Sequence, residues 1–406
     1  MNIPKLRFKD NNGNDYPQWK KVNLSDICSF LQGLTYTPNN VSNTGILVLR
    51  SSNIQNDKIS YLDNVFVNIN IPDNLFVKEN DILMCVRNGS KSLVGKNALI
   101  TPKDLGNTWG AFMMIVRNKL SNKYVYYYLN TNIFNKHIFK DLGTATINQI
   151  TKKMLQSFKI YLPQITEQEK ISNFLTTVDK KITNLENTIS SLENQKKGLL
   201  QQIFSQKLRF KDENGNNYPN WEKKKLGDIC KFTGGGTPST SILKYWNGTI
   251  PWISSSDLQT NTIHKIKISR YITNEAVSNS STKIIPKNSI LIVSRVGVGK
   301  VAISNCVLCT SQDFTNITEI NGNTTFYAYL LKYKMEQLTQ NTQGTSIKGI
   351  TTSDIKNIKL IVPIEQTEQT KIANFLLAFD RKLDNQKAQL EHWQQIKKGL
   401  LQQMFV

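Results

Sequence analysis

The 406-residue sequence is poor in the residues that most often carry enzyme chemistry. Its three histidines, His137, His264 and His392, show no metal-ligand spacing. Its five cysteines are odd in number and scattered, which favours a reducing compartment over a disulfide framework. Cys306 and Cys309 form a lone CxxC pair, and a buried strand is the favoured interpretation because no second pair lies at zinc spacing. No apolar run approaches a membrane span and no signal peptide opens the chain, so we expect a cytoplasmic protein without a membrane partner.

Two glycine-containing stretches approach a phosphate-binding loop without matching it. Gly297-Val-Gly-Lys300 lacks the GxxxxGK[ST] spacing, and Val301 stands where a magnesium-binding hydroxyl is needed. Five residues separate Gly89 from Gly95-Lys96, and Asn97 follows. We interpret both stretches as turns between strands. The Asn-Pro-Pro-aromatic motif of amino-methyltransferases and a glycine fingerprint for S-adenosylmethionine are also missing, so we predict no active site, metal or cofactor on this chain.

Acidic residues are scarce, at 30 against 51 Lys and Arg, and the formal net charge is +21. The basic excess is divided equally between two blocks. Residues 1–162 hold 20 basic and 10 acidic residues, residues 207–361 hold the same numbers, and the two segments that follow these blocks are close to neutral. Solubility alone does not require two separate basic blocks, which are typical of two footprints on a polyanion.

The chain is an internal duplication. The motif KLRFKD at residues 5–10 recurs at residues 207–212, and the motif KKGLLQQ at residues 196–202 recurs at residues 397–403. Between these matched borders the two halves are only faintly alike. Matched borders around divergent interiors are typical of two related modules that recognise different things.

The segments 163–206 and 362–406 predict two long helices. Apolar residues recur in them with alternating four- and three-residue steps, which is the heptad pattern of helices that pair along a seam. The predicted seam positions are Ile171, Val178, Leu185, Leu192 and Leu199 in the first helix, and Ile372, Phe379, Leu390, Trp393 and Leu400 in the second. Lys196 and Lys397 occupy matching seam positions, where they either fix the helix register or extend to solvent.

The order of these parts predicts a pseudo-twofold arrangement. The first helix runs into the second KLRF motif, and joining the C-terminus to the N-terminus would recreate the same junction. Both basic blocks are β-rich in pattern, because short apolar runs such as Ile46–Leu49, Ile82–Val86 and Ile290–Val293 are split by Asn, Gly, Ser and Pro. We therefore predict an α+β fold with two β-rich domains separated by two long antiparallel helices.

Together these motifs resemble the specificity subunit of type I restriction–modification enzymes, over essentially the whole chain. The resemblance implies target recognition domains at residues 1–162 and 207–361, with helical spacers at 163–206 and 362–406. It implies that each domain reads one half of an asymmetric, bipartite site in double-stranded DNA, and that the helices set the gap between the halves. It also implies two methyltransferase subunits and restriction (translocase) subunits as partners, which would carry S-adenosylmethionine, ATP and magnesium. The chain itself would be non-catalytic.

Basic and polar side chains in loops bounded by strands are the predicted DNA contacts, because Lys and Arg reach phosphates while Arg, Asn, Gln and Ser read base edges. The predicted positions in the first domain are Arg50, Ser51, Ser52, Asn53, Arg87, Asn88, Ser90 and Lys91, with Trp109 as either a stacking or a core residue. Those in the second domain are Ser254, Ser255, Ser256, Asp257, Arg295, Lys300 and Gln312. Residues 234–238 predict a mobile glycine-rich loop near the DNA. Packing at strand ends is the alternative role for each position.

An alternative from another class of protein remains open. The chain could be a coiled-coil scaffold whose basic domains bind a protein, a membrane or another polyanion. Salt-sensitive, sequence-selective DNA binding separates the two hypotheses, because a scaffold would show none.

Overall fold

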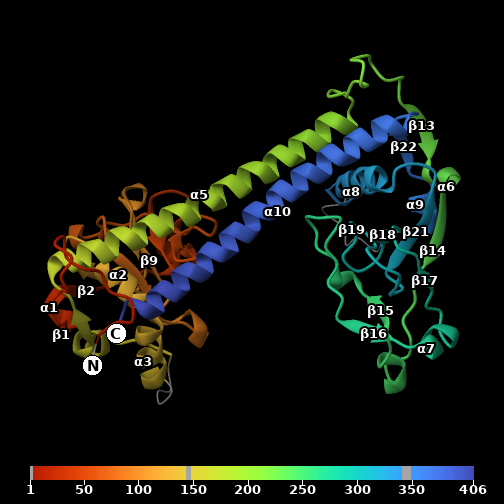
Figure 1. The fold of residues 1–406 in the computed structure, drawn as a ribbon. Helices are drawn as coiled ribbons and strands as arrows, with labels where there is room; N and C mark the ends of the chain where they lie inside the picture. Colours follow the sequence, from red (N-terminus) through yellow and green to blue (C-terminus); the bar gives the residue numbers. More distant parts are fainter. Residues whose placement is uncertain (1–2, 143–147, 341–348) are drawn as a thin grey trace. The chain divides into compact units, whose positions relative to one another are not determined.

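The computed structural model describes residues 3–142, 148–340 and 349–406, and it is an α+β protein made of two compact units. Unit 1 comprises Met1–Glu186 and Gln389–Val406, and unit 2 comprises Asn187–Ala388. Two long helices, α5 (Ile165–Phe204) and α10 (Gln366–Gln403), contribute to both units (Figure 1). The predicted fold class is confirmed.

Unit 1 holds two four-stranded sheets. The first has the order β2-β11-β8-β9 and is formed by Cys28–Gln32, Met113–Asn118, Ile82–Cys85 and Asn97–Leu99. The second has the order β10-β4-β7-β3 and is formed by Thr108–Trp109, Ile46–Leu49, Phe66–Val67 and Val41–Ser42. Smaller strand pairs are β1 with β12 (Lys20–Asn23 and Lys159–Leu162) and β5 with β6 (Ile54–Gln55 and Lys58–Ile59). The short helices are α1 (Leu24–Ile27), α2 (Tyr124–Leu129), α3 (Asn132–Leu142) and α4 (Lys152–Ser157).

Unit 2 repeats the strand order of the first sheet but not that of the second. Its first sheet has the order β14-β21-β18-β19 and is formed by Cys230–Gly234, Phe314–Ile320, Ile290–Val293 and Val301–Ile303. Its second sheet has the order β16-β15-β20-β17 and is formed by Arg270–Ile272, Ile250–Ile253, Leu308–Thr310 and Ile284–Ile285. A strand pair joins β13 (Glu222–Lys225) to β22 (Lys359–Val362). The short helices are α6 (Leu226–Ile229), α7 (Asn274–Ser278), α8 (Thr324–Gln340) and α9 (Thr352–Lys356).

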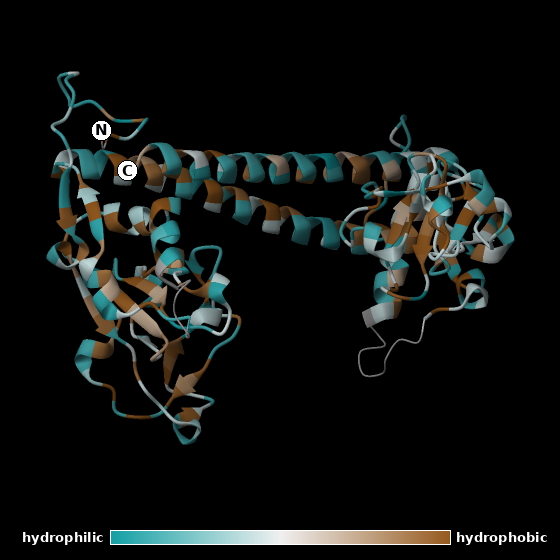
Figure 2. Cartoon of the chain, turned by 90° about the horizontal axis from the view of Figure 1, so that it is seen from below, coloured by the Kyte–Doolittle hydropathy of each residue, from teal (hydrophilic) through white to brown (hydrophobic). Residues whose placement is uncertain are grey.

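The central strands are apolar on both faces because each separates two cores. Along β8, Ile82 and Met84 pack against the helices, whereas Leu83 and Cys85 pack toward the second sheet. The β18 strand divides its residues between two cores in the same way. Side chains alternate across a strand, so a strand covered on both faces has a continuous apolar run rather than an alternating one. In Figure 2 many of the strands are coloured as hydrophobic.

The cysteines serve this packing. All five are free thiols. Cys309 is buried within β20, as the strand interpretation of the CxxC pair predicts, whereas Cys306 is half-buried and precedes the strand. Burial raises the pKa of Cys28 and of Cys230 to about 12, so both thiols stay protonated at neutral pH. Among the helices of the described residues, none is long and apolar enough to cross a membrane.

Within each unit, the start of one long helix lies beside the end of the other. The unit 1 core contains Ile171 and Leu175 near the start of α5 together with Leu401 near the end of α10. The unit 2 core contains Ile203 near the end of α5 together with Ile372 near the start of α10. The two helices are therefore antiparallel in both units.

The predicted seam positions lie on the inner faces of these helices. Ile171, Val178, Leu185, Leu192 and Ile372 are buried, whereas Leu199, Phe379, Leu390, Trp393 and Leu400 are half-buried. The buried positions of α5 continue through Leu175, Ile182 and Ile189, in steps of three and four residues. This spacing is that of a paired-helix seam.

In each unit a buried carboxylate on a long helix binds the segment that precedes the first sheet. We call this the opening segment, residues 5–23 in unit 1 and 207–225 in unit 2. Glu167, fully buried on α5, accepts hydrogen bonds from Arg7 at 2.8 and 3.0 Å and from the Trp19 indole at 3.1 Å. Glu368, on α10, is bound in the same way by Arg209 and Trp221. Buried carboxylates need such donors because desolvating an unpaired charge costs several kcal/mol. We call these two arrangements the Arg–Glu–Trp clasps.

A second matched contact lies twelve residues further along each helix. In unit 2, Asp380 of α10 pairs with Lys196 of α5 and accepts a hydrogen bond from the Tyr329 hydroxyl of α8 at 2.7 Å. In unit 1, Asp179 of α5 pairs with Lys397 of α10 at 2.9 Å and is bound by the hydroxyl of an α2 tyrosine, Tyr127, also at 2.9 Å.

We call these two arrangements the Lys–Asp–Tyr triads. In unit 2 the lysine lies on α5 and the aspartate on α10, whereas in unit 1 the lysine lies on α10 and the aspartate on α5, as the pseudo-twofold repeat requires. The two seam lysines are therefore buried or half-buried ion-pair partners rather than solvent-exposed side chains. Burial raises the pKa of Tyr127 and of Tyr329, so both hydroxyls remain protonated and can donate to the carboxylates.

The circular relationship between the two halves also appears in the backbone. The Leu6 amide donates to the Gln403 carbonyl at 2.9 Å in unit 1, and the Leu208 amide donates to the Gln202 carbonyl at 3.0 Å in unit 2. The second contact joins neighbouring parts of the chain, whereas the first joins residues close to opposite termini. The opening segment therefore docks on the end of a long helix in both units, whether or not the chain is continuous there.

We predict that Asp380→Ala destabilises unit 2 by about 3–5 kcal/mol, because it leaves Lys196 buried without its counter-ion. The matched control is Asp384→Ala, which removes the partly exposed ion pair with Lys265 and should cost about 0–1 kcal/mol. Urea denaturation followed by circular dichroism measures both. The double variant Lys196→Met/Asp380→Leu should recover most of the loss, and equal losses for the two single variants would contradict the assignment.

Candidate nucleic-acid interface

Two predicted segments of unit 1 lie together at the ends of strands. Asn88, just after β8, donates from its side-chain amide to the Ser51 hydroxyl at 3.3 Å, and Ser51 begins the turn that follows β4. The Asn88 side-chain oxygen also accepts from the Ser90 amide at 3.0 Å. Arg87 and Lys91, in the same loop, are exposed. The structure thus brings residues from two separate loops to one surface.

Arg87 is positioned by an aromatic side chain outside the predicted set. Its guanidinium carbon lies 5.1 Å from the centre of the Phe112 ring, and 58% of the Phe112 residue surface is exposed. An arginine over an aromatic face gains cation–π energy and loses rotamer freedom. The search for polar and basic loop residues missed Phe112, because its apolar character assigned it to the strand that follows.

The predicted residues of unit 2 also come together. Arg295 and Gln312 line one cleft of about 330 Å³, and Gln312 accepts a hydrogen bond from the Thr237 hydroxyl. The Lys300 ammonium donates to the Ser255 carbonyl at 2.9 Å, which links the β18–β19 loop to the turn after β15. The segment Gly297–Lys300 lies in the turn between these strands, as expected from its sequence.

The glycine-rich loop predicted to be mobile is closely packed. A side-chain carbon on Gly235 would lie 2.0 Å from the Ser311 carbonyl oxygen, and one on Gly236 would lie 2.5 Å from Ser281. These glycines therefore allow the backbone to pass close to its neighbours, and the loop is held at the edge of the cleft that Arg295 lines.

Three of the predicted positions have structural roles. Asn53 is fully buried, accepts a hydrogen bond from the Arg50 amide at 2.9 Å and donates to the Ser60 and Asp63 carbonyls at 3.0 Å. Asp257 caps the equivalent turn by accepting from the Ser254 amide at 2.8 Å. Trp109 is fully buried, and its indole donates to the Leu31 carbonyl at 3.2 Å, so it belongs to the core. We leave these three outside the candidate interface.

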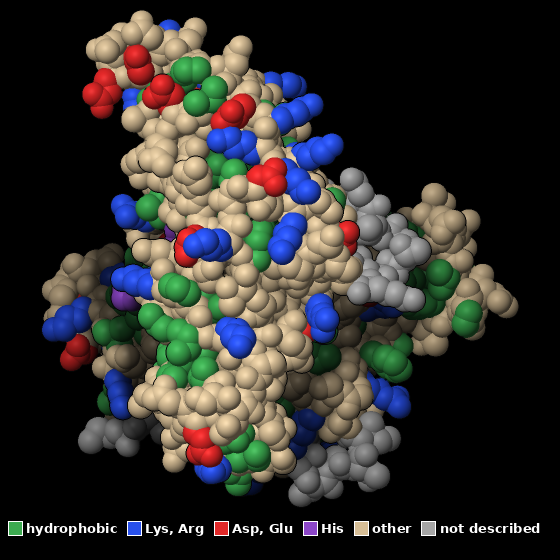
Figure 3. Space-filling view, turned by 90° about the vertical axis from the view of Figure 1, so that its right-hand side faces the viewer, with side chains coloured by type: hydrophobic (Ala, Val, Ile, Leu, Met, Phe, Trp, Pro, Cys, Tyr) green, Lys and Arg blue, Asp and Glu red, His purple; other side chains and the backbone are tan. Residues whose placement is uncertain are grey.

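The remaining turn residues are more accessible. Arg50 is partly exposed and ion-paired with Asp63 at 3.0 Å. Ser51, Ser52, Ser254 and Ser255 are half-buried, and Ser256 is exposed. Within the described part of the chain, neither Arg87 nor Arg295 forms an ion pair with a carboxylate. The face in Figure 3 carries more Lys and Arg than Asp and Glu side chains, which suits a polyanion.

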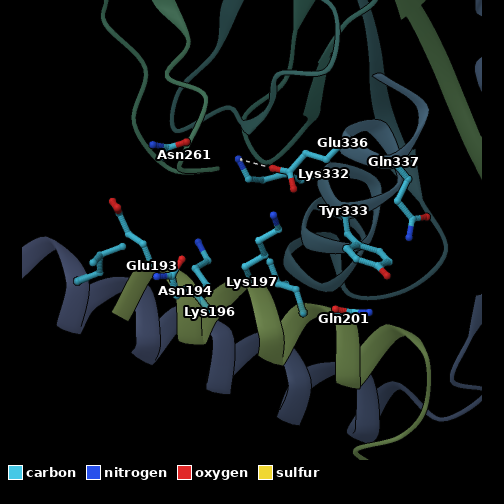
Figure 4. A pocket seen from close by; sticks show the side chains of 12 residues that line it. Glu193, Asn194, Lys196, Lys197, Gln201, Asn261, Lys332, Tyr333, Glu336 and Gln337 are labelled. Carbon is cyan, nitrogen blue, oxygen red and sulfur yellow. Dashed lines mark ion pairs between the residues drawn. The ribbon is translucent and has the colours of Figure 1, made fainter. Parts of the chain in front are cut away.

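A separate pocket of about 440 Å³ lies in unit 2, beside α5 and α8. Figure 4 shows Lys196, Lys197 and Lys332 on its wall together with Glu193 and Glu336. Lys332 lies 3.5 Å from Glu336, and burial lowers the pKa of Lys332. Because its lysines and glutamates nearly balance and no predicted base-reading residue lines it, we do not assign the pocket to DNA. No group of three or more potential metal ligands occurs among the described residues.

We predict that Asn53→Ala and Arg87→Ala separate structural from binding roles. Removing Asn53 leaves the Ser60 and Asp63 carbonyls without their buried donor and should lower the free energy of unfolding by about 1–3 kcal/mol. Removing the exposed Arg87 side chain should leave stability nearly unchanged and weaken DNA binding by about 1–3 kcal/mol if it reads a base. Urea denaturation and DNA titration measure the two effects, and a reversed pattern would refute the division.

Comparison with known proteins places this arrangement in a sequence family. The family model described as "Type I restriction modification DNA specificity domain" matches residues 16–194 and 218–392. The MjaIX specificity subunit of Methanocaldococcus jannaschii is 36% identical over 208 residues, and the match spans 50% of this chain and about half, 48%, of that relative. The putative MjaX specificity subunit of the same organism is 27% identical over 416 residues, 97% of this chain and 94% of the relative. The Escherichia coli EcoR124I/EcoR124II specificity subunit is 30% identical over 274 residues, 65% of this chain and 64% of the relative.

Two solved structures share the fold. The S subunit of a type I restriction–modification system from M. genitalium aligns with a TM-score of 0.59 and 17% identity, covering 100% of this chain and 99% of that one. A chain from a study of complex assembly in the type I restriction–modification system aligns with a TM-score of 0.57 and 16% identity, covering 95% and 97%.

Proposed function

The chain belongs to the type I restriction modification DNA specificity domain family, and we propose on this basis that it is the DNA specificity subunit of a type I restriction–modification complex. The observation that carries the proposal is that the family model matches twice, once in each half of the duplicated sequence. The named relatives are specificity subunits. DNA sequence recognition, rather than chemistry, is accordingly the function of this chain.

The finer proposal is that each unit reads one half of an asymmetric, bipartite site. Its support is that the two units share the sheet of the central strands, the clasps and the triads but differ in the side chains at the ends of the central strands. Arg87 is stacked on Phe112 in unit 1, whereas Arg295 shares a cleft with Gln312 in unit 2. Equivalent scaffolds that present different donors and acceptors select different bases.

The partners of this function are double-stranded DNA and the other subunits of the complex. We infer that two methyltransferase subunits assemble with the chain, one for each unit of the repeat, and that restriction (translocase) subunits join them. These partners would carry S-adenosylmethionine, ATP and magnesium, and the specificity subunit would bind none of them. A protein that reads cellular DNA acts where that DNA lies, so we place the chain in the cytoplasm.

We predict that the purified chain transfers no methyl group and hydrolyses no ATP by itself, and that DNA methylation appears when its methyltransferase partner is added. Incorporation of labelled methyl groups into plasmid DNA measures both states, and long-read sequencing identifies the modified bases. A bipartite motif is the expected product. Methyl transfer by the chain alone would contradict the proposal, and modification without sequence preference would favour the scaffold alternative.

We propose further that the length of the two helices sets the spacing of the half-sites. The α5 helix has 40 residues and α10 has 38, and a helix of this length spans roughly 60 Å. Inserting seven residues after Leu185 and seven after Gln386 keeps the heptad phase and adds about 10 Å. That length corresponds to about three base-pair rises of 3.4 Å.

The insertion variant should therefore methylate the same two half-sites with roughly three more unspecified base pairs between them. Its binding should be weaker, because the added length also rotates the DNA faces relative to each other. Genome-wide mapping of methylated bases measures the spacer directly. A control with seven residues inserted at only one of the two points should lose activity, because the seam no longer matches. Methylation at the original spacing by the double insertion would refute the ruler.

A further inference from the structure

The ends of the central strands can be matched residue by residue between the two units. Cys85 of β8 pairs with Met113 of β11, and Val293 of β18 pairs with Phe314 of β21. One residue further, the Val86 amide donates to the Phe112 carbonyl at 3.0 Å, and the Ser294 amide donates to the Asp313 carbonyl at 2.8 Å. These hydrogen bonds are equivalent.

A second pair of backbone contacts supports the match. The Ile150 amide donates to the Val86 carbonyl at 2.8 Å, and the Ile350 amide donates to the Ser294 carbonyl at 2.7 Å. The next residues, Arg87 and Arg295, therefore occupy the same place in their units. Phe112 and Asp313 also occupy one place, immediately beside these arginines.

The two units carry opposite chemistry at this shared place. Phe112 exposes 58% of its surface and packs one ring face under Arg87, so it offers an apolar surface to a ligand. Asp313 is half-buried, and among the described residues its Oδ2 accepts a hydrogen bond from the Ser311 hydroxyl at 3.1 Å. A carboxylate has about four acceptor sites, so Asp313 keeps capacity for a further donor.

We propose that this position determines which base is read beside the arginine in each half-site. Phe112 packs against the 5-methyl group of a thymine in the half-site of unit 1, and Asp313 accepts a hydrogen bond from the exocyclic amine of a cytosine in the half-site of unit 2. In the major groove thymine alone shows a methyl group. Cytosine and adenine both show an amine donor, but the adenine amine lies beside the N7 acceptor, which a carboxylate does not complement, so Asp313 fits cytosine. The inference rests on the proposed function and names two residues that decide its specificity.

The proposal assigns Arg87 and Arg295 each to a guanine, the base that arginine reads most often in the major groove. It assigns the neighbouring strand-end residue to the adjoining base pair. In unit 1 the stacked Phe112 ring also limits the motion of the guanidinium. Phe112 thereby contributes a contact of its own and orients Arg87.

The test uses the chain assembled with its methyltransferase partner. The DNA duplexes contain the motif that the wild-type complex methylates. Each thymine of the motif is replaced, one at a time, by uracil, which lacks only the 5-methyl group. One replacement should weaken wild-type binding about fourfold, the value of one buried methyl group. The same replacement should have no effect on the Phe112→Ala complex, because its methyl contact is already lost.

Two further variants serve as controls in the same assay. Phe139→Ala removes another exposed phenylalanine, on α3, and should keep the wild-type sensitivity to uracil. Phe112→Leu keeps an apolar side chain and should keep part of the sensitivity, which provides a readout if the alanine variant folds poorly.

Asp313 is tested through its cytosine. The Asp313→Ala complex should relax selection at one C·G pair of the other half-site by about 5- to 150-fold, the range for one base-reading contact, and should leave the half-site of unit 1 unchanged. Selection is measured with duplexes in which each C·G pair is changed in turn. Unchanged selection at every cytosine would overturn the assignment of Asp313.

For Phe112, the inference is overturned if uracil has no effect at any thymine of the motif, or if the Phe112→Ala complex keeps the wild-type sensitivity. A uniform loss of binding on all duplexes would also overturn it, because that result assigns Phe112 to the phosphate backbone or to a partner subunit. These failures leave a wild-type complex that still selects a bipartite motif. A wild-type complex without any sequence selection would instead refute the proposed function itself.

Discussion

The buried carboxylates of the two long helices fix where each sheet domain is attached. Glu167 and Glu368 are almost completely shielded from solvent, and each is satisfied only when an arginine and a tryptophan from an opening segment reach it. Asp179 and Asp380 lie twelve residues, or about 18 Å, further along and require a lysine from the other helix and a tyrosine from a recognition domain. A sheet domain is thus fixed to its helix pair at two levels in each unit, and any sliding would leave a charge unpaired in a poorly solvated place.

Because these contacts hold each sheet domain, the side chains at the ends of the central strands can differ between the units. The residues that hold each unit together are matched pairwise, Glu with Glu, Asp with Asp, Lys with Lys and Tyr with Tyr. At the ends of the central strands Arg87 and Arg295 are matched, whereas the neighbouring position changes from Phe112 to Asp313. Recognition requires different donors, acceptors and apolar groups held in one geometry. Separating the supporting contacts from the reading contacts lets one scaffold serve two different half-sites.

The paired helices and the central strands could be predicted from sequence because burial alone determines their patterns. The heptad steps of α5 and the apolar run Ile290–Val293 reflect which faces are covered, whatever covers them. The role of Lys196 could not be predicted, because its partner Asp380 lies on another helix and becomes visible only when the helices are paired. Asn53 and Asn88 follow buried strands in similar loops, yet one is a buried cap and the other contacts Ser51 at the surface. That difference depends on backbone geometry, and so does the exposure of Phe112 at the start of an apolar run.

Two units that read DNA independently share one pair of long helices. The most direct measurement maps methylated bases in cells that express the methyltransferase partner with a chimera whose residues 22–160 come from a relative of different specificity. We expect a motif in which one half-site is replaced while the other half-site and the spacer between them are unchanged. A chimera in which both half-sites change, or in which the spacer changes with the exchanged domain, would contradict it.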